Sequence, residues 1–524
     1  MKIAVAQLDP CVGDLDANLD AMLLAAQMAE RQEADLLVFP NASLTGAPLD
    51  GLAASAAFVA DAREHLRRFA QETPVLCLAA GVSEIDERRG RCDVELFACG
   101  DGAVTSMGVP ALQDDASCPA LVAGGLNVAV LLGRHFARDV ELSDMDVLVE
   151  MCADAFGTAY AARAATGQLE DLSSIAATCK AHVVAANLCG AADSHVFSGN
   201  SAVLAPDGRL VHASPIDAAE VFTFDTQAGE AQVCEDFEDV RVEPEEIVWR
   251  ALKAATRDYV RKNGFSDVVV GLSGGIDSAV VATIAADALG AGHVHGVAMP
   301  GPCSTPGSVA DARALAENLG CELVELPIDG PLAAFHKALG GACGGEVGGV
   351  AAENLQARVR CVQLMTLANA SGRIVLNTGN KSEAAMGFST LYGDTAGAYA
   401  PIGDLYKSEV YALARWRAAQ GPSIPQASID KAPSAELYPG ARDDDRLPPY
   451  DVLDAVLFDH VEGEMGAKAL VEAGHDAAVV EQVLRQVQAA EFKRRAEPPA
   501  PHIQGCSLSF QRNWPVTNRW VDNS

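Results

Sequence analysis

The stretch VVVGLSGGIDSAVVA, residues 268–282, predicts a strand, a tight turn and a helix in immediate succession. Consecutive valines are typical of a strand that is buried in a parallel sheet, and we expect the helix to begin at about Ser278. Between the two, Gly271, Gly274 and Gly275 let the backbone turn sharply. The N–H groups at the start of a helix can then approach an anion. The stretch therefore predicts a phosphate-binding site.

Side chains in the same loop add groups that such a site uses. Ser273 and Ser278 can donate hydrogen bonds, and Asp277 can hold a divalent metal ion against phosphate oxygens. A glycine turn alone is as often an ordinary connection as a binding site, but here the whole SGGIDS pattern lies between a strand and a helix. The loop lacks the lysine of the GxxxxGK[ST] pattern. It resembles the pyrophosphate-binding loop of N-type ATP pyrophosphatases, which adenylate a substrate and release pyrophosphate.

Length, charge and cysteine usage narrow the class of protein. A chain of 524 residues is too long for one core and predicts two or three domains. A net charge of -33, with only 38 lysines and arginines, argues against nucleic acid as a partner. No apolar run approaches the roughly 20 residues that span a bilayer, and the N-terminus MKIAVAQLDP is typical of a first strand, so we expect a cytoplasmic protein without a membrane partner. The 14 cysteines contain no CxxC pair, which favours reduced packing residues.

The first half of the chain alternates strand and helix patterns, which predicts an α/β sandwich. The expected helix spans residues 15–31, and the expected strands span residues 3–7, 35–39, 75–78, 128–132, 147–150 and 183–187. Three segments resemble the nitrilase-type amidase domain: VAQLDPCVGDLDANL near the start, LLVFPNASLTG at 36–46 and HVFSGNSAVLAPDG at 195–208. Members of that family hydrolyse amides with a Glu–Lys–Cys triad, in which the three side chains act as base, electrostatic stabiliser and nucleophile.

All three triad positions carry other residues in this chain. Asn41 follows the Phe-Pro pair where the family has its glutamate, and a carboxamide cannot act as a general base. Ser106 or Met107 stands at the lysine position, and Gly133 at the cysteine position, with no lysine between residues 41 and 133. We therefore expect a pseudo-amidase domain with a structural role. Cys234 begins a Cys-Glu-Asp motif like the family's nucleophile motif, but it follows the FSGNS segment instead of preceding it, so we interpret it as a packing residue.

The second half predicts a doubly wound parallel sheet, whose ligands bind at the carboxyl ends of the strands. An acidic segment at 235–246 is typical of a linker. Helices are expected at 245–262, 308–319 and 353–370, and further strands at 294–299, 322–326 and 374–376. The glycine-rich segment Gly340–Gly349 suits either a solvated linker or a mobile flap.

A second polar loop, NTGNKSE at 377–383, lies between a predicted strand and a predicted helix. Its Glu383 can complete a metal site with Asp277, because Mg²⁺ prefers a few carboxylates together with phosphate oxygens and water. The helix before this loop carries polar side chains that can face a ligand: Asn354, Arg358 and Arg360.

These motifs together resemble the NAD synthetase family. The resemblance runs from about Tyr259 to the end of the chain and rests on SGGIDS, MPGPCSTPGS, ENLQARVR, NTGNKSE, TLYGDTAGAYAPIGDLYK, PSAELYPG and the C-terminal KRR, PP and WPVTNR segments. Two-domain, glutamine-dependent members carry a nitrilase-type domain in front, which is the order found here. The resemblance predicts a nitrilase-like domain at 1–235, a linker and connecting helix at 236–262, and a synthetase domain of the ATP pyrophosphatase type at 263–524. Gly301-Pro302 and the segment 439–444 depart from the family's pattern.

The resemblance also implies a reaction and a set of residues. The nicotinate carboxylate of deamido-NAD would attack the α-phosphorus of ATP, and ammonia would then attack the adenylate to give NAD and AMP. Asp277 and Glu383 would hold Mg²⁺, and together with Lys407 they are the predicted catalytic residues; Lys381 and Arg358 are weaker candidates for the phosphates. The predicted ATP ligands are Gly271, Leu272, Ser273, Gly274, Gly275, Ile276, Asp277, Ser278 and Thr378, and the predicted deamido-NAD ligands are Asn354, Glu383 and Lys493.

We predict an ATP-dependent NAD synthetase that takes free ammonia, or ammonia from a separate glutaminase, and forms a dimer or a larger homo-oligomer, as the family does. A glutamine-dependent enzyme with a rearranged triad is the first alternative. An enzyme similar to GMP synthetases would not explain ENLQARVR or NTGNKSE. A silent binder of ATP and dinucleotide would predict loss of the metal carboxylates, yet Asp277 and Glu383 are both present.

Overall fold

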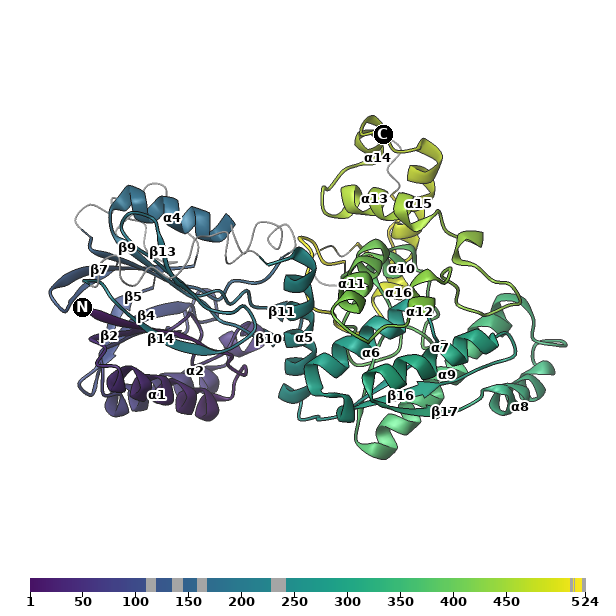
Figure 1. The fold of residues 1–524 in the computed structure, drawn as a ribbon, viewed down its shortest axis with the longest axis horizontal. Helices are drawn as coiled ribbons and strands as arrows, with labels where there is room; N and C mark the ends of the chain where they lie inside the picture. Colours follow the sequence, from purple (N-terminus) through teal and green to yellow (C-terminus); the bar gives the residue numbers. More distant parts are fainter. Residues whose placement is uncertain are drawn as a thin grey trace. The chain divides into compact units, whose positions relative to one another are not determined.

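The computed structural model describes residues 1–109, 119–133, 145–157, 167–227, 242–508, 512 and 514–520. The chain divides into two compact units between Ala251 and Leu252 (Figure 1). This division falls inside helix α5, Pro244–Lys262, whereas the predicted boundary at residue 235 lies outside the described residues. None of the described helices combines the length and the apolar character that a membrane span requires.

Unit 1 is built on two six-stranded sheets. The first has the order β14-β1-β2-β3-β4-β5, with bounds Glu220–Asp225, Lys2–Gln7, Leu36–Val38, Cys77–Val82, Val94–Gly100 and Ala103–Gly108. The second has the order β13-β12-β9-β8-β7-β6, with bounds Leu210–Ala213, Ala202–Leu204, His182–Ala186, Val147–Met151, Leu126–Leu132 and Ala120–Ala123. Helices α1, Leu15–Arg31, and α2, Ala56–Glu72, lie against the first sheet, and α4, Gly167–Cys179, against the second. The predicted α/β sandwich is confirmed.

The alternation of side chains along β1 explains these layers. Ala4 and Ala6 belong to the core beneath α1 and α2, whereas Ile3 and Val5 belong to the core between the two sheets. At the end of the strand, the buried Gln7 side chain joins the sheets. Its Oε1 accepts hydrogen bonds from N and Oγ of Ser201, both at 2.9 Å, next to the first residue of β12. The sandwich is thus held together by apolar burial and one fully satisfied amide.

Unit 2 contains a four-stranded parallel sheet of order β17-β16-β15-β18, which confirms the predicted doubly wound architecture. Its strands are Glu322–Glu325, Val294–Ala298, Val268–Gly271 and Ile374–Leu376. The helices that follow β15 are α6 Ile276–Leu289, α7 Pro306–Leu319, α8 Asp329–Gly340, α9 Gly349–Ser371, α10 Lys381–Met386, α11 Lys407–Ala419 and α12 Gln426–Asp430. Helix α6 begins before the predicted Ser278, because Gly275 is extended and serves as its N-cap.

The C-terminal part of unit 2 is helical: α13 Tyr450–Val461, α14 Ala467–Glu472, α15 Ala477–Ala489 and α16 Glu491–Arg494. These helices enclose a separate apolar core that includes Leu453, Leu457 and Val483, and Ala385 and Met386 of α10 are part of the same core. The short α10, which follows the loop after β18, therefore packs with the C-terminal helices (Figure 1).

Candidate active site

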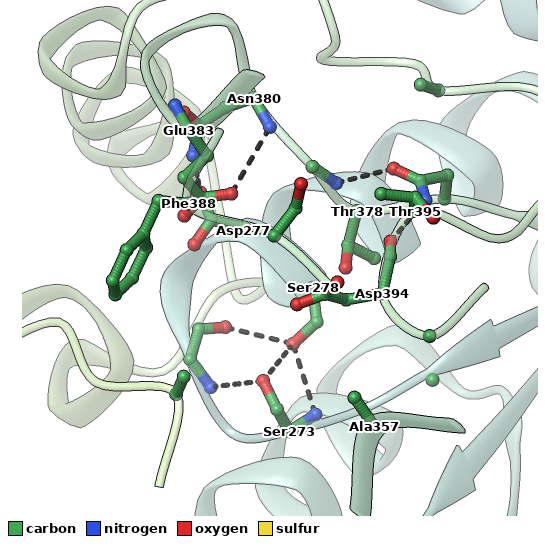
Figure 2. A pocket seen from close by; sticks show the side chains of 18 of the residues that line it. Ser273, Asp277, Ser278, Ala357, Thr378, Asn380, Glu383, Phe388, Asp394 and Thr395 are labelled. Atoms are coloured by element: carbon green, nitrogen blue, oxygen red, sulfur yellow. Dashed lines mark hydrogen bonds between the residues drawn. The ribbon is translucent and has the colours of Figure 1, made fainter. Parts of the chain in front are cut away.

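A cavity of about 330 Å³ lies at the carboxyl ends of the parallel strands of unit 2. The loop after β15, the loop after β18, α9, α10 and the first turn of α11 all contribute to its wall (Figure 2). Among the predicted site residues, the following line it: Gly271, Leu272, Ser273, Gly275, Ile276, Asp277, Ser278, Thr378, Glu383 and Lys407. The two loops, about 100 residues apart in the sequence, thus share one cavity.

The SGGIDS loop owes its shape to one glycine and two serines. Gly274 has a φ of +76°, and a Cβ placed on it would lie 2.2 Å from the backbone oxygen of Ser308 in α7. The Ser278 hydroxyl donates to the Gly275 oxygen at 3.0 Å and lies 3.2 Å from the Ser273 hydroxyl. The loop is thereby packed against α7 and braced from within, as a rigid anion cradle requires.

One cluster combines side chains from the starts of three helices: Asp277 from α6, Glu383 from α10 and Lys407 from α11. The ammonium of Lys407 lies 2.6 Å from Asp277 Oδ2 and 3.4 Å from Glu383 Oε1. The Asn380 side chain bonds both acidic residues. Its Oδ1 accepts from the Glu383 backbone N–H at 3.0 Å, and its Nδ2 donates to Asp277 Oδ1 at 3.0 Å (Figure 2). The predicted catalytic residues therefore form one cluster.

The charges of this cluster are strongly coupled. Burial raises the pKa of Glu383, opposed by the Lys407 ammonium and reinforced by the Asp277 carboxylate. Burial lowers the pKa of Lys407, but Asp277 and Glu383 raise it by more, so that the net pKa lies above its usual range. Lys407 is therefore charged. Asp443 adds a further acidic group, which receives a hydrogen bond from the Tyr450 hydroxyl at 3.0 Å.

The donor set suits a cation that shares its ligands with a nucleotide. Among the described residues there is no group of three or more His, Cys, Asp or Glu side chains arranged to hold a metal ion. Asp277 and Glu383 both reach the cavity, however, and Mg²⁺ is commonly bound by one or two carboxylates with substrate phosphates and water. The residues present therefore fit Mg²⁺ bound together with ATP, and not a metal site formed by protein alone.

Two predicted deamido-NAD ligands lie outside the cavity lining and hold the loop that follows α10. The Asn354 Oδ1 accepts from the Thr390 hydroxyl at 2.9 Å. The Lys493 ammonium donates to the backbone oxygens of Gly387 and Ser389, each at 2.7 Å. Ser389 lines the cavity and Thr390 does not, so of these two side chains only Lys493 bonds a residue of the cavity wall.

The two weaker phosphate candidates do not reach the cavity. The Lys381 side chain is fully buried, with its ammonium 2.9 Å from Asp404 Oδ1 and 2.6 Å from Glu462 Oε1, and we do not propose it as a phosphate ligand. Arg358 is exposed and donates through Nε to the Leu391 oxygen at 3.1 Å.

Several lining residues were not predicted. Asp394, whose pKa is raised by burial, accepts from the Thr390 N–H at 2.5 Å. Lys431 contacts the Ser308 hydroxyl and lies 3.6 Å from Glu436 Oε1, at the side of the cavity next to α7. The GDTAG and KAPSAE segments that carry these residues are visible in the sequence, but only the fold brings them beside the SGGIDS loop.

In unit 1, the residues predicted to stand at the triad positions make the following contacts. Asn41 donates through its backbone N–H to the Cys152 oxygen at 3.1 Å. The Ser106 hydroxyl donates to Glu95 Oε1 at 2.5 Å. Gly133 has a φ of +67°, and no atom of the described residues lies within 4 Å of where a Cβ would stand. Cys234 lies outside the described residues.

Comparison with known families agrees with this two-unit architecture. A family model described as NAD synthase matches residues 248–497, and one described as carbon-nitrogen hydrolase matches residues 2–88. The fold and these matches define a two-domain ligase, with a nitrilase-like sandwich followed by an ATP pyrophosphatase domain.

Individual relatives identify the family. The Glutamine-dependent NAD(+) synthetase of Rhodobacter capsulatus is 35% identical, with 100% of this chain and 99% of that relative covered. The structure of the glutamine-dependent NAD+ synthetase from Acinetobacter baumannii, in complex with adenosine diphosphate, is 29% identical with a TM-score of 0.76, covering 100% of this chain and 99% of that one. A Cytophaga hutchinsonii enzyme of the same description, 17% identical with a TM-score of 0.82 over 99% of this chain and 98% of that one, shares the fold. The chain belongs to the glutamine-dependent NAD(+) synthetase family, and it is an NAD+ synthetase, an ATP-dependent ligase.

Replacing Gly274 with alanine tests the packing of the loop. We expect Gly274→Ala to lower kcat/KM for ATP by about tenfold or more, because the added methyl group would force the loop away from Ser308 and misplace its N–H groups. Gly320→Ala is the matched control: its φ of +73° is nearly the same, but no atom lies within 4 Å of the new Cβ. Steady-state kinetics of both variants, with thermal midpoints, make the comparison. Equal losses of kcat/KM in both would contradict the steric argument.

Proposed function

We propose that this enzyme amidates deamido-NAD with ammonia through an adenylated intermediate. The observation that carries the proposal is the convergence of Asp277, Glu383 and Lys407 on the cavity beside the SGGIDS loop. In the first step the nicotinate carboxylate forms a bond to the α-phosphorus of ATP, and the bond from that phosphorus to pyrophosphate breaks. In the second step ammonia attacks the activated carbonyl carbon, loses a proton and displaces AMP. NAD, AMP and pyrophosphate are the products.

The proposed residue roles follow from the charges. The N–H groups of residues 271–278 and the hydroxyl of Thr378 would bind ATP, in agreement with their position on the cavity wall. Asp277 and Glu383 would hold Mg²⁺, which when bound supplies charge neutralisation for the phosphates and the leaving pyrophosphate. The Lys407 ammonium pairs with both of these carboxylates. We propose that, with ATP and the metal ion bound, it donates to a phosphate oxygen as the bond to pyrophosphate breaks, when the charge on that oxygen increases.

Deamido-NAD would bind near α10, beside the same carboxylate cluster. Glu383 lies on the cavity wall, whereas Asn354 and Lys493 are bonded to the loop 387–390. As direct ligands, these last two would have to exchange their loop contacts for substrate atoms.

The proposed nitrogen donor is ammonia, free or supplied by a separate glutaminase. The relatives are named for their dependence on glutamine, so this proposal separates the chain from them. It is supported by Asn41, Ser106 and Gly133 at the triad positions and by the match to carbon-nitrogen hydrolases, which ends at residue 88, before two of these positions. A glycine offers no nucleophile and an asparagine no base.

The choice of nitrogen donor is directly measurable. With Mg-ATP and deamido-NAD, we expect the purified full-length enzyme to form NAD with ammonium and to show less than about a hundredth of that kcat/KM with glutamine, since the expected triad residues are lacking. Equal use of glutamine would refute the proposal and favour a rearranged amidase site. Absence of NAD with either donor would favour a silent binder of nucleotides.

Asp277→Asn tests the metal role. The variant retains the shape of the side chain but loses its charge, so pyrophosphate release from ATP should fall by about 10² to 10³-fold. Asp287→Asn, later on the same helix and paired at the surface with Arg417 at 2.8 Å, should retain activity within about twofold. Pyrophosphate release assayed at several Mg²⁺ concentrations makes the measurement. Unimpaired release by Asp277→Asn would refute the assignment.

We also propose that unit 2 pairs with a second copy through α8, α9 and β17. Helix α9 buries only four of its 23 residues. These elements expose a set of large apolar side chains: Val324, Phe335, Leu339, Val350, Val362 and Met365. A second copy would cover them with the same surface, as a two-fold interface requires.

A charge placed in this surface tests the pairing. Val362→Glu should shift the protein toward monomer in light scattering, because Val362 is 57% exposed and would be buried in the pair. Leu24→Glu, on α1 of unit 1 and 56% exposed, should leave the mass unchanged. An unchanged mass for Val362→Glu would refute this surface as the interface.

A further inference from the structure

The first turn of α11 is capped by side chains of other helices. The Lys407 N–H donates to the Ser382 hydroxyl at 2.9 Å, and the Ser408 N–H donates to Asp454 Oδ2 at 2.8 Å. The Ser382 hydroxyl in turn donates to Asp454 Oδ1 at 2.6 Å. The N-cap residue, Tyr406, makes no side-chain hydrogen bond to the start of the helix, and its hydroxyl donates to Glu462 Oε1 at 3.3 Å. Two N–H groups that a helix leaves unpaired at its start are therefore satisfied from α10 and α13.

This arrangement joins the proposed catalytic residues through the backbone. Ser382 immediately precedes Glu383 in α10, and its hydroxyl bonds the N–H of Lys407. Ser382 is fully buried, and Lys407 and Asp454 are 2% and 5% exposed, so water does not replace these bonds. A shift of α11 relative to α10 would break them.

One face of α13 contacts both the start of α11 and the Lys407 ammonium. Asp454 accepts from the Ser408 N–H, and Tyr450, one helical turn earlier on the same face, places its ring centroid 5.3 Å from the Lys407 ammonium. The backbone beside Lys407 and the charged end of its side chain are thus both located against α13. A long side chain with four rotatable bonds is otherwise free to leave the two carboxylates.

We propose that Ser382 and Asp454 are positioning residues, which fix the start of α11 so that the Lys407 ammonium stands between Asp277 and Glu383. Neither side chain lines the cavity, and the two act through the backbone N–H groups of Lys407 and Ser408. The inference rests on the proposed role of Lys407 and deepens it. It implies that removing the Ser382 hydroxyl slows catalysis without weakening the binding of ATP.

The variant Ser382→Ala tests whether loss of the Ser382 hydroxyl slows catalysis without weakening the binding of ATP. We expect kcat to fall by about tenfold or more, with KM for ATP and for deamido-NAD within about twofold, because the SGGIDS loop is untouched while Lys407 is misplaced. Ser423→Ala is the matched control, since Ser423 is as deeply buried but its hydroxyl bonds only the Gly421 oxygen, at 3.3 Å. Its kcat should remain within about twofold of wild type. Thermal midpoints of both variants are recorded in parallel.

A pair of variants at Asp454 separates positioning from general stability. Asp454→Asn retains an oxygen for the Ser408 N–H and an amide that can donate to the Ser382 hydroxyl, so most of kcat should be retained. Asp454→Ala removes both and should lower kcat as Ser382→Ala does. If the loss of kcat follows the drop in thermal midpoint across Ser382→Ala, Ser423→Ala and the Asp454 pair, the role is structural and the inference is overturned.

The variant Lys407→Met separates a test of the proposed role of Lys407 from a test of the positioning role of Ser382 and Asp454. Full activity of this variant would refute the proposed role of Lys407 and the inference with it. Loss of activity in Lys407→Met, with wild-type kcat in Ser382→Ala and Asp454→Ala, would overturn the positioning inference and leave the proposed function intact.

Discussion

The pairing of one buried ammonium with two carboxylates governs the catalytic unit. An ammonium removed from water is stable only where opposite charges and hydrogen-bond acceptors surround it, and Lys407 has Asp277 and Glu383 within 2.6 and 3.4 Å. These residues come from the starts of three helices. The charge requirement therefore fixes how α6, α10 and α11 meet, and the cavity takes its shape from that meeting. The Asn380 amide, bonded to both carboxylate-bearing residues, completes the constraint.

A second buried ammonium supports the same region from behind. Lys381 is surrounded by Asp404, Glu462 and the backbone oxygen of Cys506, and the Cys506 N–H donates to Glu462. This network ties the segment around residue 506 to α10. Lys407 and Lys381 thus have different roles: Lys407 faces the cavity, and Lys381 holds the surrounding structure in place. Both side chains are buried, so their partners and their position relative to the cavity distinguish them.

Local sequence patterns predicted much of this site and missed the rest for physical reasons. The strand-to-helix turns at SGGIDS and NTGNKSE depend on residues adjacent in the chain, so their shape and side chains could be anticipated. The pairing of Lys381 with Glu462 could not be anticipated, because Glu462 lies 81 residues away and a lysine in a polar loop is solvated by default. Asp394 and Lys431 were missed for the same reason. In unit 1, the alternation of strand and helix patterns predicted the sandwich, since apolar burial is independent of any triad.

The capping of α11 from outside has a consequence for how the enzyme matures. Lys407 is held by α13, so the reactive arrangement is not complete when the sheet and its loops have formed; it needs chain as far as Asp454. A contact of this sequence separation forms late, after the entropy of closing the intervening chain has been overcome. A chain that ended before Asp454 would lack this cap, and the Lys407 ammonium would lose the contacts that locate it between Asp277 and Glu383.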